Sequence, residues 1–137
     1  MGRGMGRRAA VGVACAAVAL AGCSGDRDSD EGRKVEAVVK RFSLASGPDA
    51  CSLMTPKALT TVYGRGSLDP AVAKARCVKE SKRFSGQPVT ITFVKINDSD
   101  TAHATARTPG GRRYFSVGLE KHGGRWLINT VAPRPRP

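Results

Sequence analysis

The spacing of apolar residues changes at Pro88, and this change constrains the fold more than any other feature of the sequence. After Pro88, apolar and polar residues alternate, which is the pattern of strands that bury one face. Turn-forming residues at 97–100, 109–111 and 123–124 divide this half into four strands. Before Pro88 the apolar residues recur every three or four positions, as on one face of a helix. We therefore predict an α+β domain, with N-terminal helices packed on the apolar side of a curved four-stranded antiparallel sheet.

Three segments of the first half are predicted to be helical. The longest spans 34–45 and places four apolar residues on one face: Val35, Val38, Val39 and Phe42. Shorter helices are expected to begin at Thr55–Pro56 and at Asp69–Pro70. In each pair a side-chain oxygen can cap the first turn, and the proline that follows is tolerated there because the first helical N–H has no partner. We expect these helices to form the layer that covers the sheet.

The first 23 residues have the organisation of an export signal. Three arginines precede an uncharged, mostly apolar run at 9–22, and its 14 residues are too few to cross a bilayer as a helix, which takes about 20. The run ends in Leu20-Ala21-Gly22-Cys23, which resembles the lipoprotein signal of bacteria. The resemblance implies that residues 1–22 are removed and that Cys23 receives a diacylglyceryl group, which anchors the chain on the extracytoplasmic face of the cell membrane. A secretory signal with an unrelated cysteine is the alternative.

Both ends of the mature chain are predicted to be flexible. Residues 23–32 contain the lipidated cysteine followed by small and charged residues only, so we expect a tether that buries nothing. Residues 133–137 alternate proline with arginine, and we expect a disordered tail over 132–137 that does not pair as a strand. The folded domain is therefore expected to span 33–131.

The chain is strongly basic, with a formal charge of +12 that falls to +9 without the three arginines of residues 1–22. A basic surface is attracted to anionic polymers of a cell envelope. Nucleic acid is not expected as a partner, because the chain is exported and because one Trp, two Tyr and four Phe offer few stacking surfaces. A G+C-rich genome also favours arginine, so the charge alone does not establish any partner.

Two cysteines, Cys51 and Cys77, remain in the body of the exported chain. Because an even pair outside the cytoplasm is normally oxidised, we expect a disulfide that ties the helical layer to itself. A metal site is not expected, since neither His103 nor His122 stands at ligand spacing from a cysteine. A catalytic thiol is the weaker alternative.

Taken in order, these features resemble small lipoproteins of high-G+C Gram-positive bacteria with an NTF2-like, or SnoaL-like, domain. The matching stretches after the lipoprotein signal are Val35–Phe42, Ala50–Pro56, Ala75–Cys77 and Gly124–Ile128. The resemblance implies a cone in which the sheet curls around the first helix and leaves an apolar cavity. The residues expected near this cavity are Val39, Phe42, Phe93, Phe115 and Trp126, with plain core packing as their alternative role.

We expect a non-catalytic module of the cell envelope that holds a small apolar ligand in the cone or docks on an envelope protein. Two alternatives stay open. NTF2-like enzymes such as isomerases and dehydratases place Asp, His and Tyr inside the cone for proton transfer. Here Tyr63 and Tyr114 are available, but His103 is expected to face water and Asp69 to cap a helix, so no catalytic residue and no cofactor is predicted. The other alternative is an electrostatic tether to anionic envelope polymers.

Overall fold

The computed structural model describes residues 25–82 and 86–135. The predicted signal peptide at 1–22 and the lipid attachment at Cys23 lie outside these residues. Within them four helices precede four strands, with a short 3-10 turn between the second and third strands. The elements are α1 (Asp30–Leu44), α2 (Pro48–Ser52), α3 (Pro56–Tyr63), α4 (Pro70–Ser81), β1 (Thr90–Ile96), β2 (Thr101–Arg107), η1 (Pro109–Gly111), β3 (Tyr114–His122) and β4 (Arg125–Arg134). No helix in the two described ranges is both long and apolar enough to cross a bilayer.

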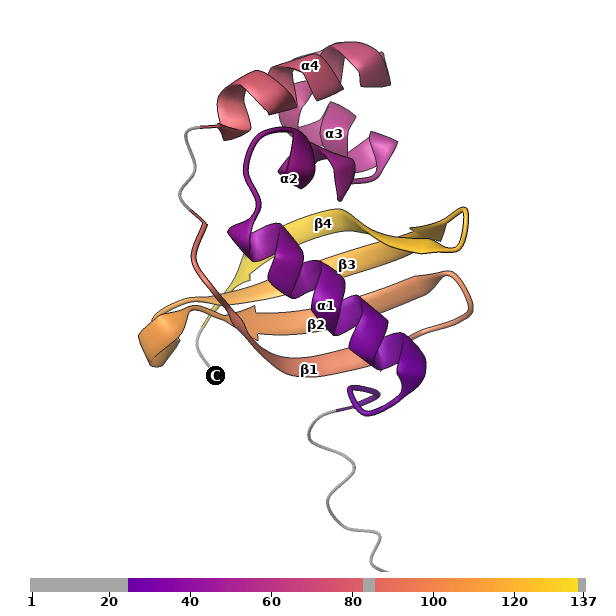
Figure 1. The fold of residues 1–137 in the computed structure, drawn as a ribbon, viewed down its shortest axis with the longest axis vertical. Helices are drawn as coiled ribbons and strands as arrows, with labels where there is room; N and C mark the ends of the chain where they lie inside the picture. Colours follow the sequence, from indigo (N-terminus) through magenta and orange to yellow (C-terminus); the bar gives the residue numbers. More distant parts are fainter. Residues whose placement is uncertain (1–24, 83–85, 136–137) are drawn as a thin grey trace, which may run out of the picture.

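The strands form one sheet in the order β1-β2-β3-β4, and all neighbours are antiparallel (Figure 1). Short turns join them, as the turn-forming residues predicted. In the first turn the Asp98 carboxylate accepts hydrogen bonds from the backbone N–H groups of Asp100 and Thr101 and from the Thr101 hydroxyl. These bonds stabilise the charged form and lower the pKa of Asp98 below its ordinary value. The predicted α+β class and the four-stranded antiparallel sheet are confirmed.

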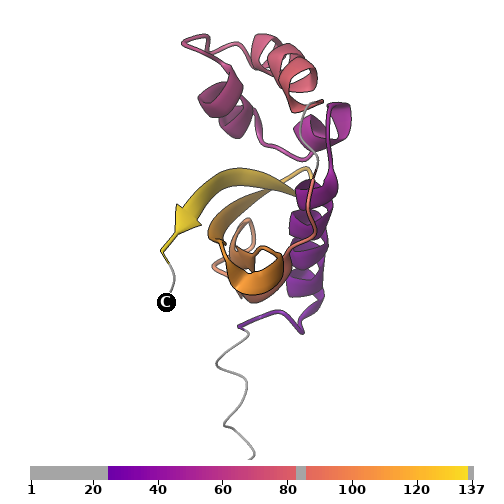
Figure 2. The same cartoon turned by 90° about the vertical axis from the view of Figure 1, so that its left-hand side faces the viewer.

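Helix α1 covers one face of this sheet (Figure 1). Its start is set by Ser29, whose hydroxyl accepts a hydrogen bond from the N–H of Gly32. Val35 and Val39 of α1 are buried in the core, as their spacing predicted. The central strand β2 contributes three buried alanines, whose small side chains leave room for the helix: Ala102, Ala104 and Ala106. Figure 2 shows that none of the four helices lies against the opposite face.

Helices α2, α3 and α4 form a separate group beside the β4 edge of the sheet (Figure 1). The connection between α2 and α3 binds this edge, since the N–H of Ile128 donates to the carbonyl of Leu53 at 2.7 Å and the N–H of Thr55 donates to the carbonyl of Ile128 at 2.8 Å. The Thr55 hydroxyl caps α3 by accepting from the N–H of Ala58, and it donates to Asn129. The prediction that all the helices cover the sheet is therefore corrected. Only α1 does so, because backbone pairing with β4 holds the other three at the edge.

The expected cysteine pair lies inside this helical group. The sulfur atoms of Cys51 in α2 and Cys77 in α4 are 1.98 Å apart, at the distance of a disulfide bond, and both residues are buried. Beside them Ser81 donates a hydrogen bond to the carbonyl of Gly47. The pair therefore connects the two ends of the group, which packs mainly on itself.

The prediction of a flexible tether at 23–32 is wrong for residues 25–32, which the structure describes. The Asp26 N–H donates to the carbonyl of Val94 at 2.7 Å, and its carboxylate accepts from the N–H of Ile96 at 2.7 Å. Gly25 forms a parallel bridge with Val94. It has φ +66, and a Cβ there would lie 2.0 Å from the Val94 oxygen, so the approach to β1 requires glycine. Backbone pairing at a strand edge orders this segment without apolar burial.

The prediction of a disordered tail at 132–137 is also wrong for the residues that the structure describes there, 132–135. Strand β4 continues to Arg134, where Pro133 pairs with Phe115 and Arg134 pairs with Tyr114. Proline is tolerated here because β4 is an edge strand and one side of its backbone needs no partner in the sheet. The Arg134 side chain donates to the Thr105 hydroxyl at 3.1 Å. The folded part of the described chain therefore extends beyond the predicted limits of 33–131 in both directions.

Candidate functional site

A predominantly apolar hollow lies where α1 ends above the sheet. It has a volume of about 230 Å³, and its walls include Phe42 of α1, Phe115 of β3 and Val131 of β4. A second hollow of about 410 Å³ lies between β4 and α3 and is lined by Val62 and Tyr63 among others. Phe42 and Val131 line both hollows. We call the two together the apolar groove.

The groove exists because the sheet extends beyond the last turn of α1. The helix ends at Leu44, and the chain turns away toward α2. The returning segment passes the helix end at Gly86, where a Cβ would lie 2.4 Å from the carbonyl oxygen of Ser43. On the sheet below, Ala106 is too small to fill the remaining space. The larger side chains around this space therefore line a groove instead of closing a core.

Part of the groove wall is exposed apolar surface. Val131 is 48% exposed and Val62 is 60% exposed. Single exposed apolar residues are ordinary, but adjacent ones that line a hollow are typical of binding surfaces. At 410 Å³ the larger hollow falls within the range of about 300–1,000 Å³ that is usual for small-molecule sites.

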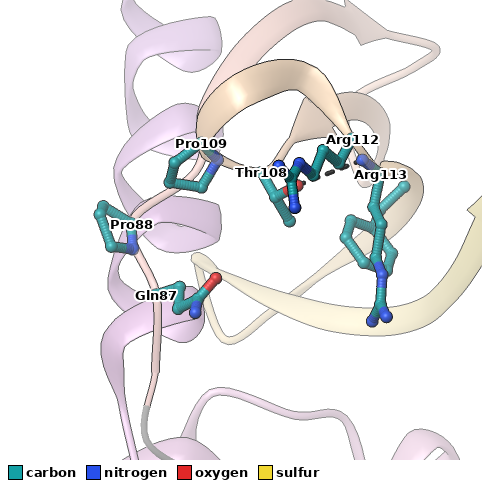
Figure 3. A pocket seen from close by; sticks show the side chains of 7 residues that line it. Gln87, Pro88, Thr108, Pro109, Arg112 and Arg113 are labelled. Atoms are coloured by element: carbon teal, nitrogen blue, oxygen red, sulfur yellow. Dashed lines mark hydrogen bonds between the residues drawn. The ribbon is translucent and has the colours of Figure 1, made fainter.

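A third, wider hollow of about 680 Å³ adjoins the apolar groove at the η1 turn. Figure 3 shows Gln87 and Pro88 on one side of it and the residues of the turn on the other, with Arg112 and Arg113 at its far end. The turn is held by Thr108, whose hydroxyl accepts from the N–H of Arg113 at 3.2 Å. We call this hollow the arginine pocket.

The arginine pocket is electrostatically positive. In the part of the chain that the structure describes, neither Arg112 nor Arg113 forms an ion pair, and no carboxylate lines this pocket or the apolar groove. Arg107 and Arg134 lie at the same end of the sheet, because both are paired with Tyr114 of β3. Unopposed cations around a hollow attract an anion.

Three of the five residues predicted to line a cavity do lie together in the groove. They are Val39, Phe42 and Phe115. Phe93 does not lie there, since a bulge between Ile91 and Phe93 shifts the alternation of β1 by one residue. Its ring lies on the sheet face opposite α1, 6.4 Å from the ring of His103.

Trp126 also departs from its predicted place. It is buried at the opposite end of α1, where its indole N–H donates to the Glu31 carboxylate at 2.8 Å. Lys121 approaches the same carboxylate at 2.8 Å, and Lys34 does so at 2.7 Å. Bonds from Lys121, Lys34 and Trp126 lower the pKa of Glu31 from 4.5 to about 2. This cluster fastens the start of α1 to the sheet and has no place in the groove.

The groups considered for catalysis do not converge. His103 lies on the face away from α1 with its Nε2 2.5 Å from the Ser116 hydroxyl, and burial together with nearby Arg134 lowers its pKa. Asp69 caps α4, as expected. Among the described residues Tyr63 is the sole titratable side chain in the apolar groove, and burial raises its pKa. No described group of three or more His, Cys, Asp or Glu residues could hold a metal ion.

Several lining residues were not found from the sequence. Val62 and Val131 are exposed apolar positions in otherwise regular elements, and their spacing carries no sign of a groove. Arg112 and Arg113 follow Pro109-Gly110-Gly111 directly, so two cations at a turn were visible. Their relation to Gln87 depends on the folding of the sheet, and it could not be inferred from spacing.

Comparisons of the chain with protein-family models, with curated proteins and with solved structures give no match. The resemblance to NTF2-like lipoproteins therefore stays a prediction. The groove and the pocket beside it are the grounds on which a function is proposed.

Proposed function

We propose that the chain is a lipoprotein anchored through Cys23 to the extracytoplasmic face of the cell membrane, with a non-catalytic NTF2-like domain that binds a small apolar ligand. The apolar groove carries this proposal. Phe42 and Val131 join its two hollows, and a ligand lying along them would cover apolar surface that otherwise faces water. Covering such surface contributes about 25 cal/mol per Å².

Two observations support the proposed location. The segment Leu20-Ala21-Gly22-Cys23 has the residues of a lipoprotein signal. The sulfurs of Cys51 and Cys77 lie at disulfide distance, and such bonds persist mainly outside the cytoplasm. Binding is favoured over catalysis because Tyr63 is the sole titratable side chain that lines the groove among the described residues, and its raised pKa keeps the phenol protonated near neutral pH, so the groove offers no base.

Ligand binding is tested with N-phenyl-1-naphthylamine, a neutral probe that fluoresces in apolar surroundings. Val131→Asp places a carboxylate in the groove wall and is expected to weaken probe binding about tenfold, because the charge would have to lose water when the probe binds. Leu68→Asp is the matched control, since Leu68 is 89% exposed and does not line the groove. Equal binding by the two variants would contradict the proposed site.

The anchor is tested separately in a bacterium that processes lipoproteins. The unaltered chain is expected to incorporate labelled fatty acid and to sediment with membranes. Cys23→Ser should lose both properties, whereas Cys15→Ser, which changes the other cysteine of the N-terminal segment, should keep them. Retention of the label by Cys23→Ser would refute the attachment site.

A further inference from the structure

We infer that the ligand is a long-chain amphiphile with an oxyanion head, either a carboxylate or a phosphate, whose chain lies in the apolar groove and whose head lies in the arginine pocket. The inference rests on the proposed binding of an apolar ligand. It adds the chemical class of that ligand and the direction in which it lies.

Continuity of the two sites is the first observation. Gln87, Thr108 and Phe115 line both the arginine pocket and the adjoining hollow of the apolar groove. One molecule can therefore contact both without crossing a wall of protein. From this shared boundary the groove continues past Phe42 and Val131 to α3. A long, narrow ligand matches this path better than a compact one.

The distribution of charge is the second observation. Among the described residues, cations line one end of the path only, because Arg112 and Arg113 border the pocket while the far hollow is lined by apolar and uncharged polar residues. Both arginines are exposed and, among the described residues, have no carboxylate partner. A cationic head would be repelled, and a neutral head would gain little from two guanidinium groups.

The donor chemistry of the pocket favours an oxyanion. Guanidinium groups present paired N–H donors that match the oxygens of a carboxylate or a phosphate. Gln87, with its side-chain amide, and Thr108, with its hydroxyl, line the same hollow (Figure 3). The Thr108 oxygen already accepts from the Arg113 N–H, so its own proton is left to donate to a head group.

The test compares ligands that share a chain and differ in the head. Palmitate, hexadecyl phosphate and hexadecanol are titrated, below the concentrations at which they form micelles, against the full chain carrying Cys23→Ser, so that no covalent acyl chain competes. Displacement of N-phenyl-1-naphthylamine gives the affinities. Inorganic phosphate is titrated alone to separate head binding from amphiphile binding.

Two double variants give the matched comparison. Arg112→Ala/Arg113→Ala removes the pocket cations, and Lys74→Ala/Lys79→Ala removes the same charge from exposed positions on α4 that line neither site. Both anionic amphiphiles are expected to bind about tenfold more tightly than hexadecanol. This advantage should disappear in the arginine variant, persist in the lysine variant and shrink as salt is raised. Thermal unfolding of each variant verifies that it is folded.

Three results would overturn the inference without touching the proposed function. Equal affinity for hexadecanol and palmitate would show that the head is not recognised, although binding of both would leave the proposed apolar site intact. Equal losses in the two double variants would assign the effect to net charge. Binding of inorganic phosphate as tight as that of hexadecyl phosphate would show that the chain contributes nothing. Failure of all three long-chain compounds and of the neutral probe would refute the proposed function as well.

Discussion

The Cys51–Cys77 link closes a loop of 26 residues that contains α3 and most of α4. In the chain-entropy account, opening a loop of this size adds freedom to the unfolded chain and costs about 3–4 kcal/mol of stability. For a domain of this size that corresponds to a fall in Tm of about 12–16 °C. Cys51→Ala/Cys77→Ala removes the link and keeps the buried positions apolar.

In the double variant, protection from hydrogen exchange is expected to differ between the helical group and the sheet. Helices α2–α4 pack on each other and meet the sheet mainly where Leu53 and Thr55 pair with Ile128. Without the link, the amides of α3 and α4 should exchange through separate opening of the helical group and be much less protected than the β2–β3 amides, which exchange through global unfolding. Mass spectrometry of peptides after exchange distinguishes the two regions, and calorimetry gives the change in Tm.

The comparison needs the unaltered chain both oxidised and reduced. Reduction should reproduce the double variant, because either change removes the same cross-link. A fall in Tm below about 3 °C, or equal protection of the helical and sheet amides in the double variant, would refute the view that the link stabilises a semi-independent helical group.

Two further predictions concern the start of the folded chain. Glu31→Gln should lower the free energy of unfolding at neutral pH, and the difference from the unaltered chain should shrink as the pH falls from about 4.5 toward 2. The reason is that the pKa of Glu31 is lowered in the folded state, so its stabilising contribution is present above pH 4.5 and is lost as the carboxylate is protonated. Urea unfolding at several pH values measures this difference, and a difference independent of pH would contradict the prediction. Gly25→Ala should raise the exchange rates of the Asp26 and Ile96 amides about five- to thirtyfold, since a side chain is disfavoured at φ +66 and would meet the Val94 oxygen. Gly110→Ala is the control for that measurement, because Gly110 has φ +77 and a Cβ built there would meet no atom within 4 Å. If the two substitutions raised these exchange rates equally, the contact with β1 would be excluded as the cause.

Periodicity predicted those parts of the fold that apolar burial determines. The face of α1 with Val35 and Val39, the three alanines of β2 and the short turns between strands all follow from alternation and spacing. Phe93 was misplaced because the bulge in β1 adds one residue to the strand. A bulge reverses the facing of every later side chain and leaves little trace in composition.

The remaining errors arose where backbone hydrogen bonds, rather than apolar burial, order the chain. Residues 25–29 contain nothing to bury, yet Asp26 pairs with β1 through its backbone and its carboxylate. Pro133 was expected outside the sheet, but an edge strand tolerates it. The arginine pocket was missed because its walls come from two segments, around Gln87 and around Arg112, that are brought together by the fold.

The attachment of Gly25 to β1 also limits how the domain can stand on a membrane. With the proposed anchor at Cys23, a single residue separates the anchored cysteine from Gly25, and two residue steps reach at most about 7 Å. The 15-residue helix α1 is about 22 Å long, and it lies between this anchored end of the domain and the part of the groove beside Phe42. The anchored end of such a domain would stay within about 7 Å of its lipid, unlike a domain on a long flexible tether. The groove would then open about one helix length from the anchored end, so the domain would hold its binding site at a set distance from its own lipid.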